Sequence, residues 1–397
     1  MSPIHPYILK ELYYESPQSI ASLSNRIGKS VPLVAKGVQE LLAKEFIEDK
    51  GLAQSNGGRR ANLFALNNLN LPYILLVAVD QHQITLSLYD FSNTEIKESK
   101  KIESSLNADT FIMEELITAI DSYLGDTAMQ KIIAISISMP GFVNTALGLN
   151  TSYGIADKRC QIRNILETQY QKPTFIENDS TVIAIAEHKF GNAKDIKDVL
   201  VINLNWGVGL GMIINNKLFK GSRGFAGEFS HIPLSNLNKI CSCGKRGCLE
   251  VEASLEAVIS HALERMQQGD TSKLSSKINT NNSIDINDIL YAAKHGDQLA
   301  IESFGKIGAA LGKGIATLIH IINPEKIIIS GFGAKIGEII MPKVQSALLE
   351  YSIQRLSENT KIEISTLENS QLIGTMATAV ANLDWKTTLQ TTNTNKL

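Results

Sequence analysis

Apolar residues in the first part of the chain recur at helical spacing and then give way to short strand-like segments. Three helices are predicted where apolar positions fall three and four residues apart, over residues 7–14, 19–27 and 31–44. Gly28 separates the second helix from the third, and Ser30 is a candidate N-cap for the third. A helix, a short glycine turn and another helix form the pattern of DNA-binding helix-turn-helix domains.

Two short apolar segments, residues 46–51 and 62–66, follow these helices and flank a polar, glycine-rich tip. This order predicts a β-hairpin, or wing, with Arg59 and Arg60 at its exposed end, where arginines contact DNA phosphates or a narrow minor groove. The first 70 residues carry eight Lys or Arg and six Asp or Glu, a charge of +2, against −4 for the rest. This asymmetry is too mild to establish nucleic-acid binding alone. We predict a winged helix-turn-helix, and the alternative is a three-helix module that binds protein.

The hydrophobic pattern changes after a polar linker at residues 67–72. Apolar segments of strand length now alternate with helical segments such as residues 108–124, and the predicted strands are residues 73–79, 84–91, 131–138, 173–176, 199–204, 209–214 and 326–330. Such alternation predicts an α/β protein whose helices cover the faces of its sheets. A unit of paired strands followed by a helix recurs in each half of this part.

Composition limits the class of protein. A chain of 397 residues has room for two or three domains, and 44% hydrophobic residues with a net charge of −2 describe an ordinary soluble protein. No apolar run approaches the ~20 residues that cross a bilayer. The N-terminus lacks the basic region and apolar core of a secretory signal. We therefore predict a cytoplasmic protein without a membrane partner, and four cysteines, three of them clustered, fit a reducing compartment.

Three of the four cysteines lie within eight residues, and this cluster is the strongest chemical signal in the sequence. Three thiolates and an imidazole upstream suit a tetrahedral structural zinc ion, for which the predicted ligands are His231, Cys241, Cys243 and Cys248. The alternative is a set of buried free thiols. Glu228 and Glu250 bracket the loop, and a metal-stapled loop with acceptors at both ends is a way to hold a polar ligand site rigid.

Three segments of the chain together resemble the ROK family of repressors and sugar kinases. They are Gly227 to His231 with the cysteine loop ending at Glu250, Glu177-Asn178-Asp179 before an alanine-rich helix, and the glycine-rich run from Gly207 to Gly211. The resemblance extends from about residue 72 to the penultimate helix. It implies an α/β fold of two lobes, the actin-like ATPase fold related to ribonuclease H. The N-terminal segment looks like the DNA-binding domain of the family's transcriptional-repressor branch.

On this resemblance the chain divides into four parts. They are a winged helix-turn-helix at residues 1–70, a first lobe at 71–190, a second lobe at 191–385 whose last helix returns to the first, and a flexible tail at 386–397. The resemblance also implies the sugar contacts, which are Gly141, Asn144, Asn178, Asp179, Glu228, His231 and Glu250. Carboxylates and amides suit a sugar because each buried hydroxyl needs a hydrogen-bond partner.

The loops that bind ATP phosphates in the family's kinases are altered here. Those kinases follow the Asp at the end of the first strand with a glycine-rich turn and a Thr, whereas this chain has Asp80-Gln81-His82. Trp206 stands where the second phosphate loop has a Gly-Thr type pair. We therefore predict that the protein is not an enzyme. If kinase activity survives, Asp179 is the base that takes the proton of the sugar hydroxyl.

Together these features predict a sugar-responsive transcriptional regulator, a repressor of carbohydrate-utilisation genes. A sugar or sugar phosphate would bind between the lobes and release double-stranded operator DNA from a homodimer or tetramer. The predicted DNA contacts are Lys29, Ser30, Lys36, Gln39, Arg59 and Arg60. A ROK-type sugar kinase with an added DNA-binding domain is the alternative, and a zinc-stabilised scaffold that binds neither sugar nor ATP is a third hypothesis.

Overall fold

The computed structural model describes residues 2–54, 60–103, 113–127, 129–279 and 283–385. The chain forms two compact units, which are Met1–Val182 with Gln371–Leu397 as unit 1, and Ile183–Ser370 as unit 2. It passes into unit 2 within helix α6 (Asp179–Phe190) and returns at the start of helix α13 (Ser370–Asn382). The predicted tail at residues 386–397 lies outside the described residues.

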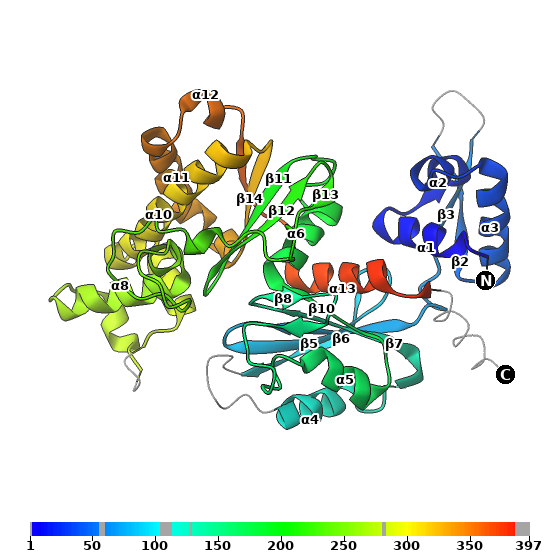
Figure 1. Ribbon diagram of the computed structural model, residues 1–397, viewed down its shortest axis with the longest axis horizontal. Coiled ribbons are helices and arrows are strands. Elements are labelled where there is room, and N and C mark those ends of the chain that lie inside the picture. Colours follow the sequence, from blue (N-terminus) through cyan, green and yellow to red (C-terminus); the bar gives the residue numbers. More distant parts are fainter. Residues whose placement is uncertain (1, 55–59, 104–112, 128, 280–282, 386–397) are drawn as a thin grey trace. The chain divides into compact units, whose positions relative to one another are not determined.

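The N-terminal segment of unit 1, residues 2–66, is called the head, and it contains helix-turn-helix and hairpin elements (Figure 1). Its elements are α1 (His5–Tyr14), β1 (Gln18–Ser19), α2 (Ile20–Ile27), α3 (Val31–Ala43), β2 (Ile47–Leu52) and β3 (Asn62–Leu66). Gly28 ends α2 with a left-handed φ of 67° and turns the chain into α3. Strands β2 and β3 pair antiparallel, and β1 adds to the other side of β3.

Five strands form the sheet of unit 1, in the order β10-β7-β4-β5-β6. Their bounds are β4 (Tyr73–Val79), β5 (Gln83–Tyr89), β6 (Glu95–Glu103), β7 (Ile132–Met139) and β10 (Thr174–Asn178). Strands β4, β7 and β10 are parallel, whereas β5 and β6 are antiparallel additions. The hydrophobic pattern does not predict β6, because the charged residues of this strand carry no core signal. A charged strand at a sheet edge discourages pairing with other chains.

The sheet of unit 2 has the same strand order as the sheet of unit 1. It runs β13-β12-β11-β14-β15, with bounds β11 (Val199–Leu204), β12 (Val208–Ile214), β13 (Lys217–Leu218), β14 (Lys326–Gly331) and β15 (Lys361–Ile364). In both sheets the first strand lies in the middle, the next two extend it antiparallel, and the last two extend it parallel. The recurring unit seen in the sequence is therefore a structural repeat.

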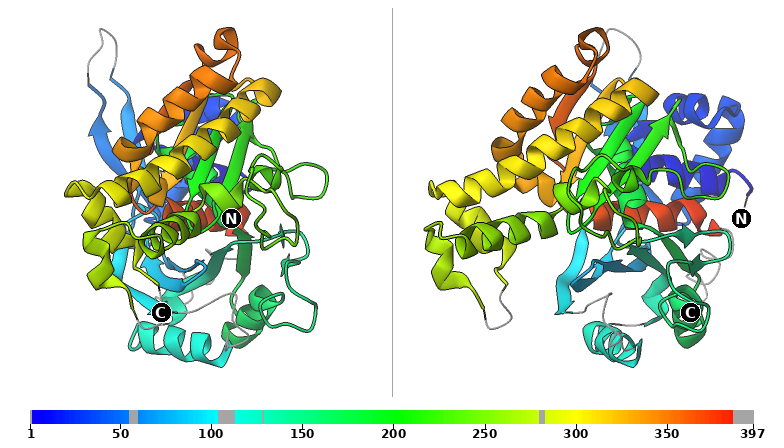
Figure 2. Two further views of the ribbon diagram at one scale, coloured as in Figure 1. Left: turned by 90° about the vertical axis from the view of Figure 1, so that its left-hand side faces the viewer. Right: turned by 60° about the vertical axis from the view of Figure 1, so that its left-hand side comes forward.

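Helices cover these sheets and complete the two cores. Unit 1 uses α4 (Met113–Leu124) and α5 (Ile162–Tyr170), while unit 2 uses α8 (Leu255–Gln267), α9 (Ile286–Lys294), α10 (Gln298–Ile322) and α11 (Gly337–Tyr351). Helices α10 and α11 lie side by side (Figure 2). Gly308 and Gly312 make this possible, since a Cβ at either would stand 2.9 Å from a carbonyl oxygen of α11. The short elements are β8 (Val143–Asn144), β9 (Leu149–Asn150), α7 (Glu250–Ala253) and α12 (Gln354–Ser357).

Helix α10 alone among the described residues has the length and apolar composition of a membrane-crossing helix. Its most apolar 18-residue window has a mean hydropathy of 1.2, and 56% of that window is buried inside the molecule. Residues along its length, including Phe304, Leu311 and Ile315, belong to the core of unit 2. Its apolar character is thus accounted for by its place in the core.

A fully buried carboxylate, Glu187 of α6, joins several loops of unit 2. It accepts hydrogen bonds from the hydroxyls of Ser365 and Ser330 and, at 3.1 Å, from the backbone N–H of Asn192. Burial raises the pKa of Glu187 above its ordinary value of 4.5, and these hydrogen bonds oppose that rise only in part. The end of α6 is therefore anchored to β14 and to the loop that follows β15.

We expect Glu187→Gln to change how stability depends on pH. Because the folded chain binds this proton more tightly than the unfolded chain, wild-type stability should fall as pH rises from 4.5 to the raised pKa. The glutamine variant lacks this loss, so its melting temperature relative to wild type should increase across that window. Thermal melts from pH 4 upward measure the difference, with the exposed Glu256→Gln as control. A constant difference at all pH values would contradict the expectation.

Candidate functional site

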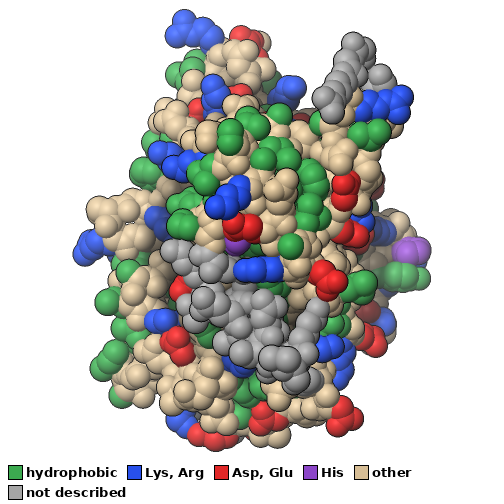
Figure 3. Space-filling model, turned by 90° about the vertical axis from the view of Figure 1, so that its right-hand side faces the viewer, with side chains coloured by type: hydrophobic (Ala, Val, Ile, Leu, Met, Phe, Trp, Pro, Cys, Tyr) green, Lys and Arg blue, Asp and Glu red, His purple; other side chains and the backbone are tan. Residues whose placement is uncertain are grey.

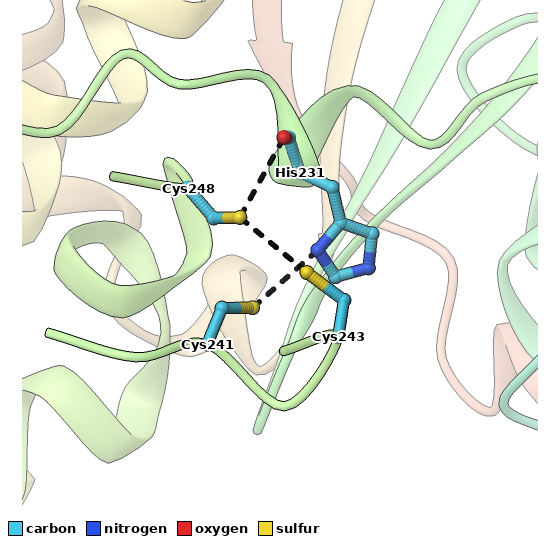
Figure 4. Close-up of side chains that lie close together, drawn as sticks. All are labelled: His231, Cys241, Cys243 and Cys248. Carbon is cyan, nitrogen blue, oxygen red and sulfur yellow. Dashed lines mark hydrogen bonds between the residues drawn. The ribbon is translucent and has the colours of Figure 1, made fainter. Parts of the chain in front are cut away.

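The predicted zinc ligands converge in unit 2 (Figure 4). One ligand atom from each of four residues lies within 4.8 Å of all the others, and these residues are His231, Cys241, Cys243 and Cys248. The imidazole comes from a single-turn helix at Phe229–His231, two thiols come from the loop, and the third precedes α7. Distances of 3.5 Å from Cys241 Sγ to His231 Nδ1 and 3.6 Å between Cys243 and Cys248 Sγ connect the set.

These positions fit a tetrahedral metal ion. A zinc–sulfur bond of about 2.3 Å places two thiolates at the corners of a tetrahedron about 3.8 Å apart, close to the separations seen here. Burial, together with contact to Cys243, raises the pKa of Cys248 to about 12. A divalent cation reverses that effect, because a coordinated thiol loses its proton. The donor set is therefore suited to zinc, held by His231 Nδ1 and three sulfurs.

Backbone hydrogen bonds fold the loop around this cluster. The N–H of Cys241 donates to the carbonyl of Lys245 at 2.8 Å, and the N–H of Gly244 donates to the carbonyl of Cys241 at 2.8 Å. Gly244 and Gly247 have φ of 83° and 78°, which favour glycine. The N–H of Leu249 donates to the carbonyl of Ile232 at 3.0 Å, so the segment after the loop is tied back beside His231.

Two carboxylates flank the cluster in unit 2. Glu228 Oε2 lies 3.7 Å from His231 Nε2, the ring nitrogen that faces away from the thiols. Such a carboxylate orients a metal-bound imidazole. Glu250 Oε1 accepts a hydrogen bond from Ser242 at 3.2 Å, and its Oε2 would be 3.0 Å from a Cβ at Gly207. Burial raises the pKa of Glu228, with the charge of His231 opposing the rise and that of Glu250 adding to it.

The other predicted sugar contacts gather in unit 1 at the ends of β7 and β10. Asn178 donates to the carbonyl of Gly141 at 3.2 Å, and its Oδ1 accepts from the N–H of Thr181 at 3.0 Å. Asn178 therefore caps α6 and holds the Gly141 loop beside Asp179, the first residue of that helix. The start of a helix favours a carboxylate, because the exposed N–H groups carry partial positive charge.

The Gly141 loop is shaped by residues that the sequence analysis did not select. Gly141 has a φ of 108°, and a Cβ there would overlap the hydroxyl of Ser152. The buried Asn150 donates to the carbonyl of Pro140 at 2.9 Å and accepts from the N–H of Ser152 at 3.1 Å. No spacing in the sequence marks Asn150. Asn144 uses its Oδ1 to accept from Leu147 at 3.1 Å, a local turn contact.

The structure thus groups the predicted sugar contacts by unit. Unit 1 contains Gly141, Asn144, Asn178 and Asp179. Unit 2 contains Glu228, His231 and Glu250. In unit 1 the hydrogen bond from Asn178 to Gly141 joins segments 37 residues apart, whereas the unit 2 residues all flank the cysteine loop.

The altered phosphate loops adopt tight turns. The N–H of Asp80 donates to the carbonyl of Gln83 at 2.8 Å, which closes a two-residue turn between β4 and β5. Gln371 of α13 donates to the carbonyl of Val79 at 3.2 Å, at the end of β4. In unit 2, Trp206 packs against the hydrophobic core at the tip of the β11–β12 hairpin. Both turns therefore carry bulky side chains, which are Gln81 and His82 after β4 and Trp206 after β11.

The predicted DNA contacts within the described residues are exposed on the head. Lys29, Ser30, Lys36, Gln39 and Arg60 all face solvent, while α3 buries Val34, Val38 and Leu41. Ser30 occupies the N-cap position, but its hydroxyl makes no capping hydrogen bond. Arg59 lies outside the described residues. On the face drawn in Figure 3, Lys and Arg are dispersed among acidic and apolar side chains, so charge alone marks no DNA-binding surface on that face.

Comparisons with known proteins agree with this architecture. The sequence model of the ROK family matches residues 76–381. The chain is 29% identical over 348 residues to the DNA-binding transcriptional dual regulator NagC of Escherichia coli K12, a match covering 87% of this chain and 84% of that protein. It is 28% identical over 386 residues to the xylose repressor of Caldicellulosiruptor bescii, covering 95% of each.

Solved structures include both regulators and kinases. A ROK family transcriptional regulator, a homolog of the E. coli MLC protein, matches with a TM-score of 0.78 and 25% identity over 98% of this chain and 99% of its own. A ROK family glucokinase from Streptomyces griseus, solved with glucose and AMPPNP, matches with a TM-score of 0.66 and 25% identity over 76% of this chain and 97% of its own. The predicted two-lobed α/β fold is confirmed, and kinases share it.

We expect Cys243→Ser to lower the zinc content of the purified chain. One ligand of four is lost, and the melting temperature should fall by roughly 5–10 °C as the metal's stabilisation disappears. A strong chelator added to wild type should produce a similar fall. Metal analysis per chain gives the direct measurement, and Cys160→Ser, which changes the one cysteine outside the loop, is the matched control. Equal zinc content in Cys243→Ser and wild type would contradict the ligand assignment.

Proposed function

Because this chain belongs to the ROK family, we propose that it is a transcriptional regulator, a repressor of carbohydrate-utilisation genes that responds to a sugar or sugar phosphate. The observation that carries the proposal is the head, a helix-turn-helix with a hairpin joined to a ROK domain. The similar regulator covers 98% of this chain, whereas the similar glucokinase covers 76%. A DNA-binding role places the protein in the cytoplasm.

In this proposal α3 enters the major groove of operator DNA. Its buried face fixes it on the head, and Lys36 and Gln39, three residues apart, share the exposed face. Arg59 and Arg60 contact phosphates or the minor groove from the hairpin. A homodimer, or a tetramer built from two dimers, presents two heads to a palindromic operator. Lys29 and Ser30, which directly precede α3, contact the sugar-phosphate backbone of the DNA.

The proposed effector site uses the two sets of polar side chains. Asp179 and Asn178 accept and donate hydrogen bonds to sugar hydroxyls near the Gly141 loop, with Asn144 beside it. Glu228 and Glu250 supply acceptors from the metal loop, and His231 supplies an N–H donor at Nε2 because its Nδ1 is the proposed zinc ligand. Zinc supplies rigidity to that loop, since it holds the imidazole and three thiolates in one geometry. Sugar binding favours a conformation with lower affinity for DNA.

A sugar kinase is the second candidate, favoured by the match to the S. griseus glucokinase and by Asp179 in the base position. The turn at Asp80 and the packed Trp206 argue against it, because phosphates need close approach of backbone N–H groups. Gln371 also covers the end of β4. Sugar binding does not require phosphoryl transfer, since a carboxylate that accepts a proton also accepts a hydrogen bond.

The test binds the protein to DNA from upstream of its own gene. Glucose, xylose, N-acetylglucosamine and N-acetylglucosamine 6-phosphate are then each titrated into the complex. We expect one of them to release specific DNA without ATP. Asp179→Asn should keep the affinity for DNA but weaken the affinity for that sugar by about 10–100-fold, the effect of losing a hydrogen bond to a charged group. Fluorescence anisotropy measures both constants. Absence of specific DNA binding, with consumption of ATP in the presence of a sugar, would establish the kinase alternative instead.

We expect the head to bind DNA in two separable ways. Lys36→Ala with Gln39→Ala should reduce affinity for the operator more than for unrelated DNA, because groove contacts carry sequence information. Arg60→Ala should weaken binding to operator and to unrelated DNA about equally, and it should reduce the slope of log Kd against log salt by about 1. Anisotropy titrations at several salt concentrations measure both effects. Lys294→Ala, which changes an exposed lysine of unit 2, is the control. Unchanged DNA affinities in all head variants would show that the head does not contact DNA through these residues.

A further inference from the structure

Helix α13 contacts the candidate sugar site at one end. Gly374 packs so closely on α6 that a Cβ would overlap the carbonyl oxygen of Val182, three residues after Asp179. Ser136 of β7 donates to the carbonyl of Thr375 at 2.8 Å, and Gln371 donates to Ser138 at 3.1 Å. The first half of α13 is therefore fixed to α6 and β7, the elements that precede or carry Asp179 and the Gly141 loop.

The other end of α13 contacts the head. Tyr14 of α1 donates to the carbonyl of Ala377 at 3.5 Å, and Lys10 Nζ donates to the carbonyl of Ala381 at 2.6 Å. Ala381 lies in the last turn of α13, where carbonyl groups lack helical partners and attract positive charge. Burial lowers the pKa of Lys10, so its ammonium group is partly withdrawn from water. Figure 1 shows α13 extending from α6 toward the head.

A buried aromatic cluster strengthens this contact. Tyr13 of the head, Phe91 after β5 and Trp385 after α13 are 5%, 2% and 1% exposed. The ring centroids are 6.4 Å apart for Tyr13 and Phe91 and 5.1 Å apart for Phe91 and Trp385. Tyr13 also donates to Asn93 Oδ1 at 2.7 Å, in a turn closed by bonds from Ser92 and Thr94 to one carboxylate oxygen of Asp90.

The head is thus docked on the rest of unit 1 and not merely joined to it by a linker. Leu71 is only 4% exposed, and Asn70 donates to the carbonyl of Glu45 at 3.3 Å, so the connection itself is packed. Within the head, α1 leaves α3 little freedom, because a Cβ at Gly37 would lie 2.7 Å from Ile4 and Ile8. Close-packed interiors transmit displacement between neighbouring elements. A shift of α13 therefore moves α1, and α3 with it.

We propose that α13 couples sugar binding to DNA affinity, taking up displacement from α6 at Gly374 and passing it to the head through Lys10, Tyr13 and the Phe91–Trp385 cluster. This inference rests on the proposed function. It assigns the regulatory contact to a set of residues that touch neither sugar nor DNA. Coupling between such sites typically changes affinity by about 5–150-fold.

The experiment compares Lys10→Met with Tyr13→Phe, as a double variant, against wild type. Each change removes one polar contact and keeps the apolar body of the side chain. The sugar used is the one that releases wild type from DNA, among glucose, xylose, N-acetylglucosamine and its 6-phosphate. We expect the DNA affinity of the double variant without sugar, and its Kd for that sugar, to stay within about threefold of wild type. The effect of that sugar on DNA affinity should shrink by about tenfold. Tyr7→Phe, the same change at an exposed tyrosine of α1, is the control.

A second readout separates coupling from simple stabilisation. The sequence contains two tryptophans, so chain labelled with 5-fluorotryptophan gives two fluorine resonances, assigned with Trp206→Phe. Sugar should shift the Trp385 resonance in wild type and shift it less in the double variant. The coupling is overturned if sugar releases the double variant from DNA as effectively as it releases wild type. It is also overturned if sugar leaves the Trp385 resonance of wild type unshifted. Either result leaves the proposed function intact. Wild-type DNA affinity that ignores all four sugars overturns both.

Discussion

The parallel pairing of strands in two repeated sheets is the constraint on which the candidate site depends. Parallel strands end at one edge, so the segments that follow them meet there although they are far apart in sequence. Asp80 follows β4, Gly141 follows β7, and Asn178 closes β10. In unit 2 the same geometry places Asn205 after β11 and Gly331 at the end of β14. The chemistry of each loop varies, but its position does not.

The metal loop solves a different problem. Residues 228–250 contain little regular structure and few buried apolar side chains, so packing alone would hold Glu228 and Glu250 weakly. Four ligand atoms lie within 4.8 Å of one another, and a tetrahedral ion held there would order both carboxylates through His231 and the loop backbone. In unit 1 the corresponding order comes from the hydrogen bonds by which Asn178 caps α6 and holds the Gly141 loop.

One helix, α13, contacts both the end of β4 and the head. Gln371 of α13 donates to the carbonyl of Val79, the last residue of β4. The same helix accepts hydrogen bonds from α1 at its other end. The turn after β4 and the position of the head therefore both depend on the same helix.

Much of the fold and of the candidate chemistry is predicted by the sequence. Helical spacing predicts α1 to α3, buried apolar runs predict β4, β7, β11 and β14, and residue type with short spacing predicts the Cys3His group. These depend on local pattern. Three features appear only in the folded chain: the charged β6 forms a sheet edge, the buried Asn150 holds the Gly141 loop, and Phe91 packs against both Tyr13 and Trp385. No local periodicity encodes these features, because close packing selects partners by shape as the chain folds.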